Sequence, residues 1–379
     1  MILSYKYRLY PNQKQRQTLG RILEIHRQLY NDALTERRLA WKMKRVSIAY
    51  LTQANQLKAI REFDAEAAFV NYSSVQQTLR RLQKSFEAFF RRLKAGEKAG
   101  YPRYKGQGWF KSVGYVYGDG LRLKGDRVYV QRVGEVRMVQ HRPLPHGTIK
   151  QVILKRDWVG NWHAIFQVEL PDREPASGPT PSVGMDMGLE VFAALSSGDM
   201  IENPRWFRVS EKKLAILQRK RARCKKGGCQ YRELTRQIGK LHEKIANQRR
   251  DFHHKLSRQL VNRFGFITVE DLNIHGLARS HVSKSMGDAG WGYFLAMLEY
   301  KAESAGTQVV RVNPKGTSQI CSACGCRVEK SLSVRVHACP HCGFTAQRDV
   351  NAALNILALG QRVAVKRSVL PRSAEAPGL

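Results

Sequence analysis

Two C-x-x-C pairs near the C-terminal end constrain this chain more than any other feature of its sequence. The cysteines concerned are Cys321, Cys324, Cys339 and Cys342. Each pair can hold a metal ion between two thiolates, and the two pairs together complete a tetrahedral site with no position left for water. Gly325 and Gly343 follow the pairs and permit tight turns. The pattern predicts one structural Zn²⁺ that stabilises a segment too small to have its own hydrophobic core.

The spacing leaves the exact ligand set of this site open. Cys326, His337 and His341 lie close to the pairs and are also zinc-ligand types, so each is an alternative ligand. Cys224 and Cys229 lie far from the pairs on either side of a Gly-Gly turn, and we expect them to be free thiols. Seven cysteines, gathered mostly in one short segment, favour metal binding in a reducing compartment over a disulfide framework.

The charge balance indicates a polyanionic partner. Lys plus Arg number 65 and Asp plus Glu 31, which gives a formal net charge of +34 at pH 7. Self-repulsion of that size needs a compensating polyanion, usually nucleic acid, with an anionic membrane surface as the weaker alternative. Lys6 and Arg8 interrupt the apolar N-terminus, and no stretch approaches the ~20 apolar residues that span a bilayer. We therefore expect a cytoplasmic, nucleoid-associated protein without membrane contact.

Hydrophobic periodicity divides the chain into regions. Residues 1–10 alternate as a strand, residues 14–93 have helical spacing, and residues 109–170 are typical of short strands with glycine-containing turns. A small basic β-barrel, completed by the first strand and carrying the helices as an insertion, accounts for this order. Residues 171–182 form a Pro/Gly/Ser linker that predicts a domain boundary. Strands and helices alternate after it, and residues 361–379 have the composition of a polar, frayed tail.

Three acidic residues stand at the ends of predicted elements in the second half. Asp186 and Glu270 each end a predicted buried strand, and Asp349 opens the last helix. A buried acid is costly unless it is paired or binds a metal. Three acids from distant elements can converge at one sheet edge, hold two Mg²⁺ ions ~3.5–4 Å apart and activate water against a phosphodiester.

Each acid also has a simpler explanation. Asp349 can be a helix N-cap, Asp186 can cap a turn, and Glu270 can be a solvated strand end, with Asp271 beside it as a competing choice. The order of strands and helices, with acids at three defined places, is more specific than any one of them. It favours an α/β layout of the ribonuclease H kind.

Several segments resemble the RuvC domain of the TnpB family, the transposon-encoded RNA-guided nucleases of bacteria and archaea. The segments are G-M-D-M-G-L (184–189), V-E-D-L (269–272), C-S-A-C-G, C-P-H-C-G and R-D-V-N-A-A-L-N-I (348–356). The opening S-Y-K-Y-R-L-Y-P-N and residues 94–106 and 247–257 match the same family. The resemblance therefore covers nearly the whole chain, in order.

The resemblance implies a multidomain α+β fold. This fold has a small β-barrel with an inserted helical domain, followed by an RNase H-like α/β RuvC nuclease domain that carries a zinc ribbon. The implied parts of this sequence are a wedge-type barrel (1–10 plus 105–180), a helical recognition domain (11–104), the RuvC domain (181–315 plus 346–365), the ribbon (316–345) and a disordered tail (366–379).

The implied function is RNA-guided cleavage of double-stranded DNA next to a short motif, by a metal-dependent endodeoxyribonuclease. Asp186, Glu270 and Asp349 fall on the family's three catalytic acids, which bind Mg²⁺ or Mn²⁺. The implied partners are a guide RNA derived from the transposon end and the target duplex. Met185 and Met187 replace more usual branched residues, but neither change removes a metal ligand.

A helix within residues 14–93 offers a candidate nucleic-acid reader. Its polar positions are Ser73, Gln76, Gln77, Arg80, Arg81 and Lys84. Glutamine suits adenine edges and arginine suits guanine, whereas a solvated polar face is the simpler alternative. Aromatic residues beside basic ones, in Trp109-Phe110-Lys111 and at Tyr115 and Tyr117, can stack bases, although most such residues in strands belong to the core.

Three other functions compete with this hypothesis. A nuclease-inactive, RNA-guided DNA-binding repressor conflicts with the intact acids. An RNA-independent transposition accessory protein, such as a transposase or resolvase, conflicts with the lack of a separate DNA-binding module. A ribosome-like basic RNA-binding protein leaves the three acids unexplained.

Overall fold

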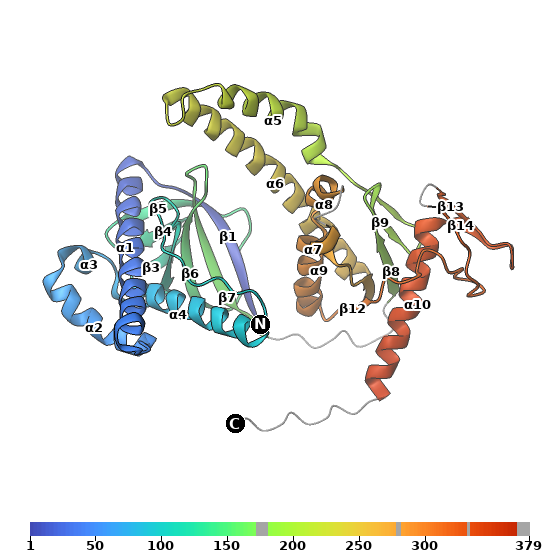
Figure 1. Ribbon diagram of the computed structural model, residues 1–379, viewed down its shortest axis with the longest axis horizontal. Coiled ribbons are helices and arrows are strands. Elements are labelled where there is room, and N and C mark those ends of the chain that lie inside the picture. Colours follow the sequence, from blue (N-terminus) through green and yellow to red (C-terminus); the bar gives the residue numbers. More distant parts are fainter. Residues whose placement is uncertain (172–180, 278–281, 332–333, 370–379) are drawn as a thin grey trace. The chain divides into compact units, whose positions relative to one another are not determined.

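The computed structural model describes residues 1–171, 181–277, 282–331 and 334–369. The chain divides into two units, Met1–Pro171 and Asp172–Leu379, each considered by itself (Figure 1). The division falls at the start of the expected linker, most of which lies outside the described residues. Every described helix is too short or too polar to cross a lipid bilayer.

The first unit is built around one antiparallel sheet in the order β2-β6-β7-β1-β5-β4-β3. β1 (Ile2–Tyr10) lies in the middle, paired with β7 on one side and β5 on the other. The first strand therefore completes the sheet, as its alternation predicted. The other strands are β2 (Ser112–Val116), β3 (Leu121–Lys124), β4 (Arg127–Val130), β5 (Gly134–Val139), β6 (Thr148–Arg156) and β7 (Trp162–Glu169). The edge strands β2 and β3 are joined by a short turn, and the sheet forms a nearly closed barrel.

The helices of this unit are an insertion between β1 and β2. They are α1 (Gln13–Lys44), α2 (Tyr50–Phe63), α3 (Ala65–Phe69) and α4 (Tyr72–Lys94). Asn12 and Gln15 form a reciprocal capping box at the start of α1, and Asn71 caps α4. The apolar faces of α1 and α4 are buried in the same core as the strands. The helices and the sheet therefore fold as one body.

The second unit contains a mixed sheet in the order β10-β9-β8-β11-β12. β8, β11 and β12 are parallel, whereas β9 and β10 are antiparallel to their neighbours. The strands are β8 (Ser182–Met187), β9 (Val191–Leu195), β10 (Met200–Glu202), β11 (Phe266–Glu270) and β12 (Gln308–Val312). The helices are α5 (Trp206–Ala222), α6 (Cys229–Arg263), α7 (Ile274–Leu277), α8 (Ser283–Ala289), α9 (Trp291–Ala305) and α10 (Arg348–Val369).

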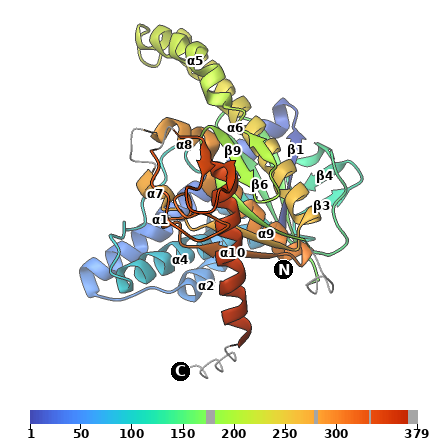
Figure 2. The same cartoon turned by 90° about the vertical axis from the view of Figure 1, so that its right-hand side faces the viewer.

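The two faces of this sheet have different partners. Val183, Met185 and Met187 of β8 join a core cluster with apolar residues of α6 and α9. α10 lies on the other face, alongside β8 and β11 (Figure 1 and Figure 2). Glycine permits this close approach at two places. A Cβ at Gly184 would collide with the backbone of Ala353, and one at Gly360 with the side chain of Thr268.

The last helix is longer than the sequence predicted. The expected tail from residue 361 is wrong because α10 continues to Val369. Val363 packs against the cluster formed by Val310, Val312 and Ile356, which gives the extra turns an apolar contact. Of the expected disordered tail, residues 370–379 lie outside the described residues.

Candidate active site and metal centre

The three acids singled out in the sequence come from elements that meet on the α10 face of the second sheet. β8 and β11 are parallel, with Met185 paired to Val269, so Asp186 and Glu270 follow at neighbouring positions. Side chains alternate along a strand, and these two therefore point to the face opposite Met185. Asp349 lies in the first turn of α10, which packs on β8.

The simpler explanations for these acids do not fit the structure. Asp186 lies within the strand ladder, opposite Ala194 of β9, and does not cap a turn. Glu270 is only 8% exposed and is not a solvated strand end. Asp349 is the second residue of its helix, inside the first turn and past the N-cap position.

Asp271, the competing choice, lies on the other side of the sheet. Its carboxylate is exposed and pairs with Arg311 at 3.3 Å, and Arg311 in turn pairs with Glu299 of α9. Glu270 instead accepts a hydrogen bond of 2.6 Å from the Thr317 hydroxyl. Adjacent residues at the end of β11 thus point to opposite faces.

The electrostatics of the site show that the acids repel one another. Burial raises the pKa of Asp186 to about 7, with further contributions from the charges of Glu270 and Asp349, while Arg348 opposes the rise. Burial also raises the pKa of Glu270, against the hydrogen bond from Thr317. Clustered carboxylates of this kind suit a divalent cation, because carboxylate oxygens are its preferred ligands.

The three carboxylates are close enough to interact but are not drawn tightly together. Among the described residues, only the four cysteines bring three or more potential ligand atoms within 4.8 Å of one another. Arg348 pairs with Asp349 at 2.9 Å and also donates to the carbonyl oxygen of Val334. Arg348 therefore neutralises part of the acidic charge.

The cysteine pairs form the expected four-thiol cluster. Sγ of Cys321 lies 3.7 Å from Sγ of Cys342, and Sγ of Cys324 lies 3.6 Å from Sγ of Cys339. A tetrahedral zinc with Zn–S bonds of about 2.3 Å requires S–S separations of roughly 3.8 Å. The thiols therefore fit one Zn²⁺, as expected for a zinc ribbon.

The alternative zinc ligands lie outside this cluster. Cys326, His337 and His341 are not among its members. The ring of His337 instead contacts the Lys330 ammonium group. Cys224 and Cys229 are free thiols, as expected.

The two halves of the cluster repeat one turn. Gly325 donates its backbone N–H to the carbonyl of Cys321, and Gly343 donates to that of Cys339 at 3.0 Å. Both glycines have positive φ, +76° and +72°, which other residues rarely adopt. The second turn is carried by the hairpin of β13 (Val336–Ala338) and β14 (Thr345–Gln347).

Hydrogen bonds link the metal centre to the acids through residues that the sequence analysis missed. Asn351 is fully buried and bonds to the backbone of Ile320 and Ser322. Asn355, one turn later, donates to the carbonyl of Thr317, whose hydroxyl donates to Glu270. The spacing of the two asparagines, four apart in the last helix, is the sequence signal that places both on one helix face.

The candidate reader on α4 is divided between two surfaces. Ser73 is buried and donates to Asn71, Gln77 accepts from Gln151 of β6, and Arg81 donates to Ser112 of β2. These three side chains make contacts within the first unit, as does Arg80, which donates to the Tyr50 hydroxyl at 3.2 Å, and the six-residue reading face stays a prediction. The remaining three occur every fourth residue and share the outward face of the helix: Gln76, Arg80 and Lys84.

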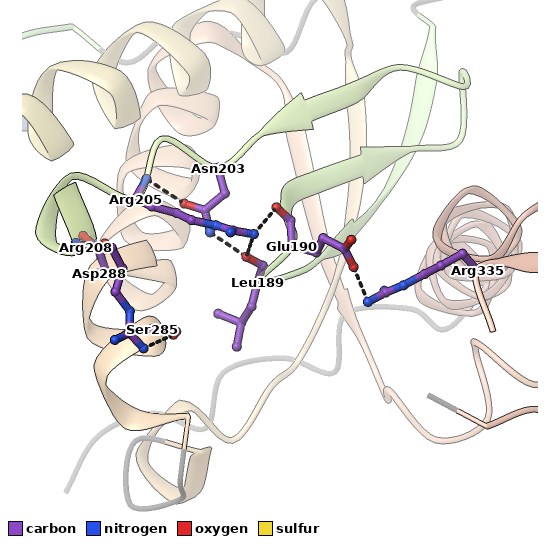
Figure 3. Close-up of a pocket in the computed structure, with 8 residues that line it drawn as sticks. All are labelled: Leu189, Glu190, Asn203, Arg205, Arg208, Ser285, Asp288 and Arg335. Carbon is purple, nitrogen blue, oxygen red and sulfur yellow. Dashed lines mark hydrogen bonds and ion pairs between the residues drawn. The ribbon is translucent and has the colours of Figure 1, made fainter. Parts of the chain in front are cut away.

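A polar pocket of about 690 Å³ opens at the turn that follows β8 (Figure 3). Arg205 donates to the carbonyls of Leu189 and Glu190, and Arg335 pairs with the Glu190 carboxylate. Arg205 has φ +49°, an uncommon conformation for a residue other than glycine. The pocket is lined by Leu189, Glu190, Asn203, Arg205, Arg208, Ser285, Asp288 and Arg335.

Three family profiles match parts of the chain. One described as "Probable transposase" covers residues 165–281, and one described as "Cas12f1-like, TNB domain" covers residues 291–356. A third, described as "Helix-turn-helix domain", covers residues 1–45. Residues 1–45 contain one strand, β1, and one long helix, α1. They therefore form no helix-turn-helix.

Relatives and a solved structure match nearly the whole chain. A protein of Streptomyces pristinaespiralis, named as a candidate RNA-guided DNA endonuclease, is 32% identical over 94% of this chain and 89% of its own length. A protein of Escherichia coli K12 with the same description, InsQ, is 30% identical over 95% of this chain and 92% of its own length. A chain in the cryo-EM structure of a Cas12f1–sgRNA–target DNA complex has a similar fold, with a TM-score of 0.58 at 17% identity over 91% of this chain and 83% of that chain. The chain therefore belongs to the TnpB family.

Proposed function

We propose that this protein is an RNA-guided DNA endonuclease that cuts double-stranded DNA next to a short motif by metal-dependent phosphodiester hydrolysis. The observation that carries the proposal is the convergence of Asp186, Glu270 and Asp349 on one face of the second sheet, with the pKa of Asp186 raised to about 7. Perturbed acids gathered on one face are typical of functional sites. A relationship over the full length to proteins named as RNA-guided endonucleases supports the same conclusion.

The parts of the chain take the following roles in this proposal. The barrel, residues 1–10 plus 105–180, is a wedge domain, and the inserted helices, 11–104, are a recognition domain. Residues 181–315 plus 346–365 are an RNase H-like RuvC domain, supported by the strand order β10-β9-β8-β11-β12 with its parallel core. Residues 316–345 are the zinc ribbon.

Asp186, Glu270 and Asp349 would hold the catalytic Mg²⁺ or Mn²⁺. When bound, such ions stabilise charge on a phosphodiester and supply an activated water nucleophile. The chain's own contribution is to fix the carboxylates. Thr317 orients Glu270 by a 2.6 Å hydrogen bond, and Arg348 holds Asp349 by ion pairs. These contacts limit the reorganisation that cleavage requires.

The zinc ribbon acts on this site indirectly. Its first turn bonds to Asn351, and Asn355 and Thr317 lead from the ribbon to Glu270. The four thiolates leave no ligand position for water, so zinc has a structural role. The ribbon therefore stabilises the start of α10 and, with it, the position of Asp349.

The basic surface binds the nucleic acids. A net charge of +34 suits a guide RNA derived from the transposon end, its heteroduplex with the target strand, and the displaced strand. Gln76, Arg80 and Lys84 on the outer face of α4 are the candidate contacts to a short duplex motif. Arg205, Arg208 and Arg335 around the pocket beside β8 are suited to the phosphates of the strand that is cut.

Purification from the host locus, with sequencing of the bound RNA, tests the proposal. A defined structured RNA with a variable 3′ segment is expected. Cleavage of a duplex that matches this segment, in Mg²⁺, is then measured beside a gel-shift on the same duplex. Absence of a bound RNA, or cleavage that ignores the guide sequence, would overturn RNA guidance. Binding without cleavage would indicate a repressor and contradict the nuclease assignment.

A further inference from the structure

Two tryptophans of the first unit lie exposed against each other. Trp109 is 66% exposed and Trp158 is 70% exposed, with ring centroids 4.9 Å apart and planes at 76°. Trp109 precedes β2, and Trp158 lies at the tip of the β6–β7 hairpin, 49 positions later in the chain. Phe110 and Tyr115, which the sequence places in the same aromatic region, are instead buried in the core. Exposed indole surface is costly in water, and a pair of exposed rings is typical of a binding surface.

The fold holds this tryptophan pair (Trp109 and Trp158) on rigid turns. The carboxylate of Asp157 accepts hydrogen bonds from the backbone of Val159 at 3.0 Å and of Asn161 at 2.7 Å, so the hairpin tip is fixed. Gly160 has φ +94°, which closes the turn. Trp109 donates its backbone N–H to the carbonyl of Gly106 at 3.0 Å. Little conformational freedom is therefore lost when a ligand binds the rings.

The basic residues Lys111 and Arg156 lie beside the pair, with the Asp157 carboxylate as their acidic neighbour. The Lys111 ammonium nitrogen lies 2.9 Å from the ring centroid of Trp158, and Arg156 is hydrogen-bonded to Lys111 through the backbone. A pocket of about 250 Å³ is lined in part by Gly108 and Phe110, the chain neighbours of Trp109. Glu24, the acidic residue in its lining, is paired with Arg27. The pocket is lined by Gly20, Leu23, Glu24, Arg27, Gln107, Gly108, Phe110 and Arg156.

We propose that the tryptophan pair is a stacking platform for unpaired nucleobases of the RNA partner, with Lys111 and Arg156 at the adjoining phosphates. This inference depends on the proposed function in one respect, namely that RNA is a partner of the protein. Aromatic faces beside cations match the two parts of a nucleotide, its base and its phosphate. Folded RNA presents splayed bases in loops and bulges, whereas intact duplex DNA keeps its bases stacked inside the helix. RNA is therefore the occupant that this surface fits.

The test uses the full-length protein and the RNA that co-purifies with it, transcribed in vitro. Trp109→Ala and Trp158→Ala are each expected to weaken RNA binding roughly 10-fold, and the double variant up to about 100-fold. Trp158→Phe, which keeps an aromatic face, should stay close to wild type. Trp41→Ala is the matched control. Trp41 is also exposed, at 52%, but its ring contacts Arg45 and does not belong to the tryptophan pair.

The salt dependence separates stacking from charge. Removing an indole deletes no phosphate contact, so the slope of log affinity against log salt should stay unchanged in the tryptophan variants. Lys111→Gln should lower that slope by about one. These results, with quenching of tryptophan fluorescence on RNA binding that is reduced in the double variant, would support the platform.

Other results overturn the inference and leave the proposed function intact. Wild-type RNA affinity in the double variant would show that the rings bind something else. A lower melting temperature with unchanged RNA affinity would show that they pack within the protein. Equal competition by a single-stranded DNA of the same sequence would remove the assignment to RNA. Failure of any RNA to co-purify would instead contradict the proposed function.

Discussion

The two units of the molecule use polar groups in opposite ways. In the described part of the first unit, buried polar side chains are neutral or basic, such as His26 between α1 and α4. The second unit buries carboxylates, Glu270 and Asp288. Asp288 has partners, because it accepts from the backbone of Phe207 and from Arg249. The site acids have fewer partners, and burial together with the charges of Glu270 and Asp349 raises the pKa of Asp186.

This difference suits the first unit to binding and the second unit to chemistry. A core that buries no carboxylate side chain among its described residues makes the first unit a stable platform, which suits recognition by surface charge and aromatic rings. The second unit contains a four-thiol cluster that fits a cation, and burial makes Asp186 and Glu270 costly as charged groups. Its stability and activity should therefore depend on metals, whereas those of the first unit should not.

Loss of the zinc site should have the largest effect. Cys324→Ser removes one of four thiolates from a cluster of a kind whose apparent binding free energy is ~10–16 kcal/mol. We expect loss of zinc by metal analysis, and fast hydrogen–deuterium exchange in residues 316–331 and 334–345 with the first unit unchanged. Cys224→Ser, at a free thiol outside the cluster, is the control and should keep its zinc. A wild-type protein that contains no zinc would contradict the assignment.

Removal of an acid should abolish cleavage but not binding. Asp186→Ala should reduce cleavage of a guide-matched duplex by roughly 10³-fold or more, because several kcal/mol of transition-state stabilisation are lost. A gel-shift on the same duplex should be unchanged, since base pairing and backbone contacts hold the target.

Asp271→Ala is the matched control for this experiment. Its exposed ion pair with Arg311 lies on the opposite face, and such pairs contribute about 0–1 kcal/mol. Cleavage should stay near wild type. Loss of cleavage equal to that of Glu270→Ala would refute the assignment of the three acids.

The hydroxyl that links the ribbon to the acids should have an intermediate effect. Thr317→Val keeps the shape of the side chain but removes the donor to Glu270. Loss of a group that orients a metal ligand typically costs 10–100-fold in metal affinity or activity, and we expect about that loss, partly restored by higher Mg²⁺. Thr345→Val, in the same ribbon but bonded only to a nearby backbone carbonyl, should cleave normally. Equal losses in both variants would indicate a general effect on the ribbon.

The pH dependence of stability should have opposite signs in the two units. Burial lowers the pKa of His26 to about 3, so its contribution is complete above pH ~6.5 and is lost as pH falls towards 3. The pKa of Asp186 is raised to about 7, so in magnesium-free buffer the second unit loses stability as pH rises from about 4 to 7. At about 1.4 kcal/mol per pKa unit, shifts of roughly three units correspond to an effect of up to about 4 kcal/mol on the free energy of unfolding of each unit.

Replacing each of these two residues with a side chain that does not titrate isolates its contribution to the pH dependence. Relative to wild type, Asp186→Asn should stabilise the second unit most near pH 7, and His26→Gln should reduce the loss in the first unit below pH 6. Hydrogen–deuterium exchange, followed separately in each unit, shows whether the stability of that unit rises or falls with pH. A wild-type-minus-variant difference that does not vary with pH would mean that the group does not titrate as described.

Much of the site could be predicted from the sequence because its signals are local. The C-x-x-C spacing identified the four thiols, and the strands predicted from periodicity carry their acids at the last position of β11 and the last but one of β8. The helical spacing of α4 also predicted a polar face, but not that Ser73 and Arg81 would be used by the fold. Which polar residues stay free depends on what packs beside the helix, and propensity carries no information about that.

The sequence alone predicted a four-thiol metal site, a polyanionic partner and the three acids of the candidate site, because thiol spacing, net charge and buried acids each follow from residue type and local order. Tertiary structure decided what those residues contact. The parallel pairing of β8 with β11 put Asp186 beside Glu270, and α10 brought Asp349 to them across Gly184. Only the fold joined Thr317 to Glu270 and Trp109 to Trp158. Contacts between residues distant in the chain are set by the packing of whole elements, and no local pattern records them.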